Sequence, residues 1–305
     1  MRYYISLTDY NWYRFLCDKN YDEINFWRPG TKAFAALVPG ELFVFKLKSP
    51  HNAIVGGGFF TSYSLAPIDL VWSAFGTRNG TATEKEFVER LADYRLKNSI
   101  DLNYPTVGCI LLSSPFFLQE DDWIRSPKDW SSNIVTGKRY SGQDGSEGQR
   151  VYQELVAKLQ IPETQLAAQS QQMQYGLGLA KYRLGQGTFR LMVADNYSRK
   201  CAISGEKTLP VLDAAHIIPC SASGDNTISN GILLRSDLHT LFDAGYITIT
   251  DDYHVEVSRR IREDFGNGRD YYKHHGNSLV SLPDDFWRVP SKENLRWHNS
   301  NVYLG

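Results

Sequence analysis

The sequence contains few of the features that mark membrane or secreted proteins. It has no run of about 18 uninterrupted apolar residues, the length that a membrane-spanning helix requires, so we expect no membrane anchor. Its first residues, Met1–Asp9, lack the apolar core of a signal peptide. We therefore expect a cytoplasmic protein.

Cysteine is also scarce. The four cysteines, Cys17, Cys109, Cys201 and Cys220, stand singly, and no two have the C-x₂-C spacing of a zinc knuckle. A disulfide framework is not expected in a cytoplasmic chain. We interpret the four thiols as small packing residues.

An excess of charge of one sign is missing as well. The chain has 33 Lys and Arg residues against 34 Asp and Glu residues, which excludes a uniformly basic coat for nucleic acid but not a local basic groove. Apolar residues make up 42% and charged residues 22% of the chain, as in ordinary globular proteins. Its 305 residues suffice for two domains.

The first ~118 residues read as a β-rich domain. Alternation and turn signals predict strands at Met1–Leu7, Phe34–Val38, Leu42–Leu47, Ala53–Thr61 and Val107–Ser113. Thr8 is the expected N-cap of a short helix carrying Trp12, Phe15 and Leu16, and a capping box formed by Thr83 and Glu86 predicts a helix over Thr83–Lys97. Gly56, Gly57 and Gly58 lie inside a strand pattern, so we interpret them as a bulge or a close backbone approach rather than a phosphate loop.

The middle of the chain separates two regions with different sequence patterns. Residues 115–148 read as a structured loop, and a helix follows to Leu159. The Gln- and Ala-rich segment that comes next is the candidate linker. The predicted organisation is a domain over 1–160, a linker over 161–176 and a second domain over 177–305.

Three polar residues of the second half have a distinctive spacing. His216 closes the predicted strand Val211–Ile218, Asn230 lies 14 residues later, and His239 lies 9 residues after that at the start of a predicted helix. A hairpin over Asp251 and Asp252 follows. The segments Leu212–Pro219, Ser229–Gly231 and Arg235–Gly245 resemble the HNH nuclease motif, a ββα finger that holds one metal ion.

The resemblance extends from Tyr182 to Ile249 and implies a role for each motif residue. His216 would be the general base that deprotonates water, a task suited to a side chain titrating near neutral pH. Asn230 would hydrogen-bond across the finger and fix the strand or the imidazole that presents His216. His239 would ligate a divalent ion from the helix.

Two positions depart from the usual pattern. Many HNH enzymes carry a second metal ligand directly before the base, where this sequence has Ala215. Asp213 lies two residues back, on the same strand face as Ala215, and is the expected substitute, with Asp237 as the rival. Few protein ligands would leave several waters on the ion, as Mg²⁺ or Mn²⁺ prefers. Arg235 is placed either to meet a phosphate or simply as a solvated cation.

The zinc knuckle that many HNH domains contain is also incomplete. Its first cysteine pair is reduced to Cys201 and Ser204, and no second pair follows. No structural zinc is expected. Packing by Ile217, Leu238, Phe242 and the following hairpin would replace it.

The N-terminal half resembles the PUA superfamily, in particular EVE-like modified-base readers. The resemblance rests on the strand and helix around Tyr4 and Trp12, on a Pro39-Gly40-Glu41 turn feeding a strand, and on the Gly-rich strand. It implies an α+β fold with a small N-terminal β-barrel and flanking helices. Such readers flip a base into an aromatic pocket, for which Trp27 and Trp72 are the candidate residues.

These resemblances imply a modification-dependent restriction endonuclease acting on double-stranded DNA, with a modified cytosine as the expected target. One alternative is an HNH nuclease that reads phosphorothioate or unmodified DNA. Another is a DNA-binding protein that lost its metal with the change to Ala215, although the retained His216, Asn230 and His239 argue against it. One site cuts one strand, so double-strand cleavage implies a homodimer or two sequential nicks.

Overall fold

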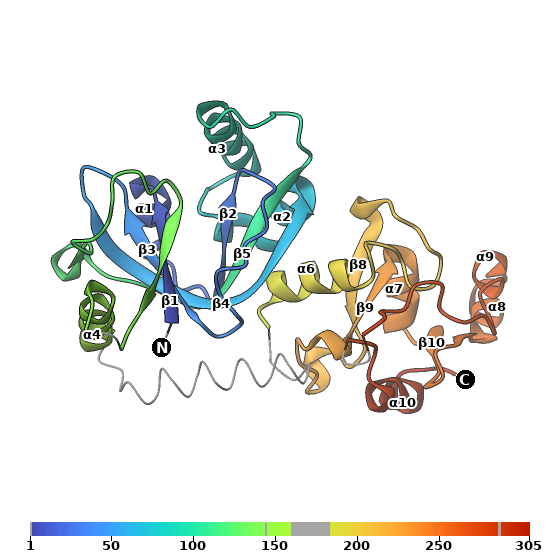
Figure 1. The fold of residues 1–305 in the computed structure, drawn as a ribbon. Coiled ribbons are helices and arrows are strands. Elements are labelled where there is room, and N and C mark those ends of the chain that lie inside the picture. Colours follow the sequence, from blue (N-terminus) through green and yellow to red (C-terminus); the bar gives the residue numbers. More distant parts are fainter. Residues whose placement is uncertain (1, 144, 160–183, 286–287) are drawn as a thin grey trace. The chain divides into compact units, whose positions relative to one another are not determined.

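The computed structural model describes residues 2–143, 145–159, 184–285 and 288–305. The chain divides into two compact units, Met1–Leu177 and Gly178–Gly305, which are described separately (Figure 1). The predicted linker over 161–176 lies outside the described residues, so the domain boundaries stay a prediction. No helix within the described ranges combines the length and apolarity of a membrane span.

The N-terminal unit is built on a seven-stranded sheet. Six strands follow the order β2-β5-β4-β3-β1-β7, and β6 pairs with β4. All pairs are antiparallel except β1 with β3. The strands are β1 (Arg2–Thr8), β2 (Glu23–Arg28), β3 (Leu42–Leu47), β4 (Ala53–Pro67), β5 (Thr106–Phe117), β6 (Ile124–Arg125) and β7 (Gly137–Ser141).

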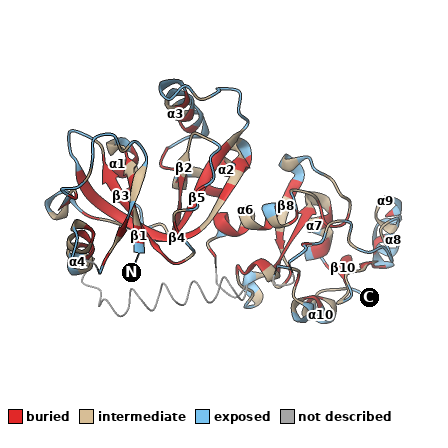
Figure 2. Ribbon diagram, viewed as in Figure 1, coloured by how far each residue is buried: buried red, intermediate tan, exposed pale blue. Residues whose placement is uncertain are grey.

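Helices cover both faces of this sheet, which explains why its strands are largely buried (Figure 2). Successive residues of a strand point to opposite faces. Accordingly, Phe43 and Phe45 of β3 pack with Trp12 of one helix, whereas Leu42 and Val44 pack in a second cluster with another helix. The helices of this unit are α1 (Tyr10–Leu16), α2 (Ile68–Phe75), α3 (Glu84–Lys97) and α4 (Glu147–Leu159).

The α+β class of the chain is as predicted, but the sheet is open. Within the described residues, the edge strands β2 and β7 do not pair with each other, so no closed barrel forms. Gly57 lets β4 approach its neighbours β3 and β5 closely. A Cβ there would lie 2.8 Å from both the Phe116 ring and the Phe43 carbonyl, and the β4–β5 register shifts between Gly57 and Phe59. The predicted close backbone approach is confirmed at this position.

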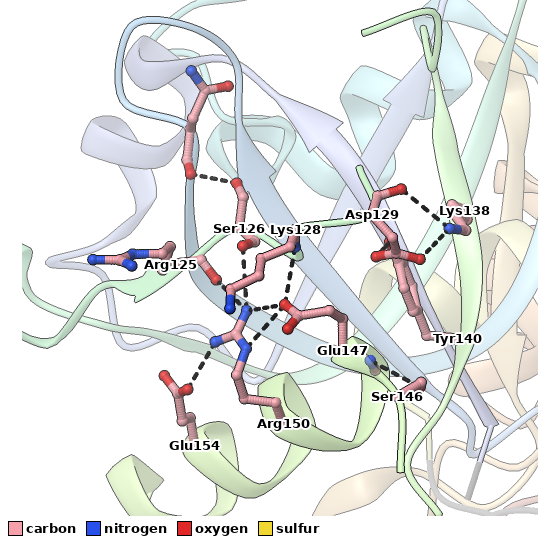
Figure 3. Close-up of polar contacts among 12 residues, drawn as sticks. Arg125, Ser126, Lys128, Asp129, Lys138, Tyr140, Ser146, Glu147, Arg150 and Glu154 are labelled. Atoms are coloured by element: carbon pink, nitrogen blue, oxygen red, sulfur yellow. Dashed lines mark hydrogen bonds and ion pairs between the residues drawn. The ribbon is translucent and has the colours of Figure 1, made fainter. Parts of the chain in front are cut away.

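Hydrogen bonds connect helix α4 to the end of β6 and to the loop that follows it (Figure 3). The Arg150 guanidinium donates to the carbonyls of Arg125 and Ser126 at 3.1 and 3.2 Å and to Glu147 Oε2 at 2.9 Å. Glu147 also accepts the Lys128 amide hydrogen at 2.9 Å. The bond from Arg150, followed by the one from the Lys128 amide, holds the pKa of Glu147 below its usual value.

Helix α3 is held to two loops by a buried cation. Arg95 is 2% exposed and donates to the carbonyl oxygens of Pro29, Tyr104 and Thr106 at 3.2, 2.7 and 2.6 Å. Three charge-assisted hydrogen bonds offset much of the cost of burying this guanidinium. Burial still lowers the pKa of Arg95.

The C-terminal unit contains a ββα finger. Strands β8 (Leu212–His216) and β9 (Gly231–Arg235) pair in antiparallel fashion, and α7 (Ser236–Asp243) follows directly. Its packing residues Ile217, Leu238 and Phe242 are fully buried, as expected. The other elements are α6 (Gln186–Asn196), β10 (Ile247–Ile249), β11 (Val255–Val257), α8 (Arg260–Phe265), α9 (Arg269–Tyr272) and α10 (Lys292–Asn301).

Most predicted elements are present, but several details differ. The predicted loop over 115–148 contains the end of β5, the strands β6 and β7, and the start of α4. The first helix is capped by Asp9 rather than Thr8, because the Asp9 carboxylate accepts the Trp12 amide hydrogen at 2.8 Å, while Thr8 still belongs to β1 and pairs with Leu47 of β3. The segment 34–38 forms no strand. Its apolar side chains Phe34 and Leu37 instead pack from a loop into the core.

Candidate functional site

His216 stands at the end of β8 with its ring held in two ways. The ring stacks on Phe189 of α6, with centroids 4.3 Å apart and planes only 7° from parallel. Its Nε2 lies 2.8 Å from Asn226 Oδ1. The stack sets the ring plane, and the hydrogen bond sets the rotation within that plane.

Asn230 clamps the chain just after His216. Its Oδ1 accepts the Ile218 amide hydrogen at 2.9 Å, and its Nδ2 donates to the carbonyls of Ile218 and Asp225 at 2.9 and 2.8 Å. Asn294 of α10 donates to the same Oδ1 at 2.9 Å. The side chain is 1% exposed, and these bonds satisfy it. Asn230 therefore fixes the backbone that presents His216 rather than the imidazole itself.

Asp213 and His239 lie together where α7 packs on β8. Asp213 Oδ2 is 3.7 Å from His239 Nδ1 and accepts a hydrogen bond from the Ser236 hydroxyl at 2.7 Å. Asp243 Oδ2 lies 3.2 Å from the opposite nitrogen, His239 Nε2. Asp243, followed by the charge of Asp213, raises the pKa of His239 against the opposing effect of burial.

Asp237 has a different partner. Its two carboxylate oxygens accept from Nε and Nη2 of Arg235 at 2.6 and 2.8 Å, a bidentate pair that lowers the pKa of Asp237. Arg235 therefore faces a carboxylate in this structure, and its Nη1 group remains for other acceptors.

The N-terminal unit contains a cavity of about 240 Å³. Its aromatic lining includes Trp27 at the end of β2 and Tyr94 of α3, whose rings are perpendicular with centroids 5.6 Å apart. The Trp27 indole donates to the Asn79 carbonyl at 2.9 Å, which fixes its orientation. Such a cavity offers flat aromatic surfaces on which a planar guest can pack.

Three polar side chains line the same cavity in a chain of hydrogen bonds. Lys48 Nζ donates to the Tyr94 hydroxyl at 3.1 Å, and that hydroxyl donates to Asp9 Oδ2 at 2.9 Å. Burial raises the pKa of Tyr94, with a further increase from Asp9, so the phenol stays protonated. Burial lowers the pKa of Lys48. The cavity therefore offers both a cation and a carboxylate to a guest.

Comparison with known proteins identifies the finger. Residues 201–250 match the family described as HNH endonuclease. The chain contains an HNH endonuclease domain. This match confirms the predicted HNH motif. The domain makes the chain a DNA endonuclease.

Two solved structures show the wider likeness of the chain. ASCH from Zymomonas mobilis is 9% identical, with a TM-score of 0.35, and the match covers 51% of this chain and 94% of that one. The modification dependent TagI restriction endonuclease is 14% identical, with a TM-score of 0.29, and the match covers 97% of this chain and 81% of that one. No curated protein matches the chain. The predicted EVE-like relationship stays a prediction.

HNH nucleases generally use one divalent metal ion, and the Asp213–His239 pair suits one. Two ligands that each lie about 2.1 Å from an ion are at most about 4.2 Å apart, and the observed 3.7 Å is compatible with that limit. Within the described ranges, no group of three or more His, Cys, Asp or Glu residues could hold a metal. Waters or substrate oxygens would therefore complete the coordination.

The structure adds residues of the HNH domain that sequence reasoning missed. Asn226 contacts the imidazole of His216 directly, and its position in a loop of irregular spacing offered no sequence signal. Arg190 Nη2 lies 3.7 Å from Asp213 Oδ1, next to Phe189, which stacks on His216. Cys201 Sγ accepts the backbone N–H groups of Ser204 and Arg235, which gives this buried thiol a structural function.

The structure separates the two predicted pocket tryptophans. Trp27 lines the cavity, whereas Trp72 of α2 is outside the lining. Trp72 stacks on Phe87 with centroids 6.1 Å apart, and Phe87 meets the Trp27 ring edge to face at 5.6 Å. Trp72 therefore supports the cavity wall from behind. Among the described residues, His216 forms no hydrogen bond or ion pair with Asp213 or His239.

Proposed function

We propose that this protein is a modification-dependent restriction endonuclease. In this proposal the N-terminal unit binds a modified base, with a modified cytosine as the expected target, and the HNH domain hydrolyses a phosphodiester bond of double-stranded DNA. The observation that carries it is the aromatic cavity around Trp27 and Tyr94, which is present in the same chain as an HNH domain.

The cavity chemistry suits a flipped pyrimidine. Enzymes that read a base outside the duplex stack it against aromatic side chains and bind its polar edge. Trp27 and Tyr94 supply rings, and Trp72 supports Trp27 through Phe87. A carboxylate accepts hydrogen bonds from the exocyclic amino group of cytosine, and Asp9 is the carboxylate that lines the cavity. Lys48 would donate to an acceptor on the same guest.

The HNH residues divide the hydrolysis among them. His216 takes the proton from the attacking water, and Asn230 holds the backbone that positions this imidazole. Asp213 and His239 would hold Mg²⁺ or Mn²⁺. A bound divalent ion stabilises the charge of the phosphate and of the leaving oxygen. Arg235 would bind a phosphate oxygen through its Nη1 group while Asp237 holds the rest of the guanidinium.

The charge balance of the sequence supports target selection by the N-terminal unit. Residues 166–305 contain 15 Lys and Arg and 15 Asp and Glu, so this part of the chain has no excess of positive charge for non-specific binding. We therefore assign selectivity to the cavity. Cleavage of both strands would require a homodimer or two successive nicks.

A cleavage screen tests the proposal. The full chain would be incubated with Mg²⁺ or Mn²⁺ and with matched duplexes that carry different cytosine modifications, phosphorothioate linkages or neither. Preferential cutting of a cytosine-modified duplex supports the proposal. Preference for phosphorothioate DNA, or equal cutting of every duplex, would instead indicate an HNH nuclease that reads phosphorothioate or unmodified DNA. Binding without metal-dependent nicking would leave a non-catalytic DNA-binding protein.

A further inference from the structure

The side chain of Asn226 has an orientation that its neighbours determine. Asn226 Nδ2 lies 2.8 Å from the Leu184 carbonyl oxygen, which can only accept a hydrogen bond. The NH₂ group must therefore face Leu184, and Oδ1 must face His216. The backbone of Asn226 adds a second tie, since its carbonyl accepts from the Leu184 amide at 3.3 Å. The residue is buried, so this arrangement cannot be exchanged readily with water.

This orientation determines the protonation of the neighbouring imidazole. Asn226 Oδ1 is 2.8 Å from His216 Nε2, and an amide oxygen only accepts. The bond therefore forms when Nε2 carries a hydrogen. A neutral imidazole has one N–H, so Nδ1 then holds the free electron pair. No described residue hydrogen-bonds Nδ1, and that nitrogen is left for a water molecule.

We infer that Asn226 is a positioning residue that holds His216 in its Nε2–H tautomer and presents Nδ1 as the proton acceptor. This inference rests on the proposed role of His216 as the base. Phe189 holds the ring plane, and Asn226 prevents the ring from rotating within it. The other polar neighbour is the Cys220 thiol, 3.9 Å from Nε2 and 3.8 Å from Asn226 Oδ1, which is too distant to replace the amide.

Two variants separate positioning from a purely structural function. Asn226→Leu removes both the acceptor for His216 and the donor to Leu184. Asn226→Asp keeps an acceptor for His216 and loses the donor to Leu184. Asn196→Leu is the matched control, because Asn196 also donates to a backbone carbonyl, that of Arg288, without touching the finger.

The readouts are the imidazole ¹⁵N spectrum of His216 in the full chain and the steady-state nicking of a cleavable duplex. We expect the wild-type protein and Asn226→Asp to show the Nε2–H tautomer, and Asn226→Leu to lose it. We expect Asn226→Leu to lower kcat by about 10–100-fold with little change in KM, and Asn226→Asp to restore most of kcat. Asn196→Leu should match the wild type.

An Nδ1–H tautomer in the wild-type protein overturns the inference even if no variant folds. Equal losses of kcat in Asn226→Asp and Asn226→Leu also overturn it. Both variants lack the hydrogen bond to the Leu184 carbonyl, so the loss of that bond would then explain the effect. Failure of the proposed function is distinguishable, because the wild-type protein would then show no metal-dependent nicking, or no preference for cytosine-modified DNA, whatever tautomer the spectrum shows.

Discussion

Asp213 Oδ2 lies 3.7 Å from Nδ1 of His239, and this contact joins the first strand of the finger to its helix. Asp237, the rival carboxylate, is bound by Arg235 through both of its oxygens. The geometry therefore favours Asp213 as the partner of His239 in holding a divalent ion.

Asp213→Asn should raise the Mn²⁺ concentration needed for half-maximal nicking more than Asp237→Asn does. The amide removes the negative charge that attracts the cation, whereas Asp237 is already neutralised by an arginine. Titration of nicking with Mn²⁺ for both variants measures the effect. The opposite order would identify Asp237 as the ligand.

His216→Ala should lower the cleavage rate by ~10²–10⁴-fold, the usual contribution of a general base. DNA affinity should not change, because the imidazole acts on water rather than on DNA. Single-turnover cleavage and a binding titration with the same duplex measure the two quantities. A near-normal cleavage rate would exclude His216 as the base.

Trp27→Ala should reduce the preference for modified over unmodified DNA by about 1–3 kcal/mol, the range for stacking of a base on an aromatic side chain. Trp72→Ala should reduce it less, since Trp72 supports the wall through Phe87. Competition binding measures the preference, and metal-dependent nicking of unmodified DNA serves as the control. Unchanged preference in both variants would remove the cavity from recognition.

Division of the chain at the predicted linker should separate recognition from cutting. We expect residues 1–160 to bind modified DNA without cutting it, because this part contains the aromatic cavity and lacks the HNH segment. Residues 177–305 should nick DNA without preference for modification. Binding and nicking assays on the purified fragments test this expectation, which fails if the two parts cannot be expressed separately or if the second part retains the preference.

His298 should make the C-terminal unit less stable in acid. Its Nε2–H donates to the Phe242 carbonyl at 3.1 Å, its Nδ1 accepts from Thr248, and its ring stacks on Phe242 with centroids 3.8 Å apart. Burial lowers the pKa of His298 from 6.5 to about 4. The unfolded chain therefore binds the proton more readily, and stability present above pH 6.5 is lost as the pH falls towards 4.

This loss should be on the order of 3 kcal/mol in the free energy of unfolding, since each pKa unit corresponds to about 1.4 kcal/mol. Urea unfolding of the full chain between pH 4 and pH 7 measures it, followed by a signal from the C-terminal unit. His298→Gln cannot titrate and should flatten this part of the profile. Identical slopes in the two proteins would contradict the assignment.

Sequence by itself determined the finger and its motif residues. His216, Asn230 and His239 have a spacing that specifies a strand, a turn and a helix, and local periodicity also predicted α3 and the β10–β11 hairpin. Those features depend on contacts between residues that are near in the chain, so capping, turn and periodicity rules apply to them. The edge strand β2 was missed because its burial comes from pairing with β5, which is distant in sequence.

Tertiary structure alone decided which partners these residues have. The contacts of Asp213 with both His239 and Arg190, the bidentate pairing of Asp237 with Arg235 and the contact of Asn226 with His216 all depend on how side chains meet across elements. The same holds for the cavity, where Trp27 faces inwards and Trp72 stands behind Phe87. These side-chain contacts depend on how one helix or strand packs on another. Composition and spacing along the chain do not specify that packing.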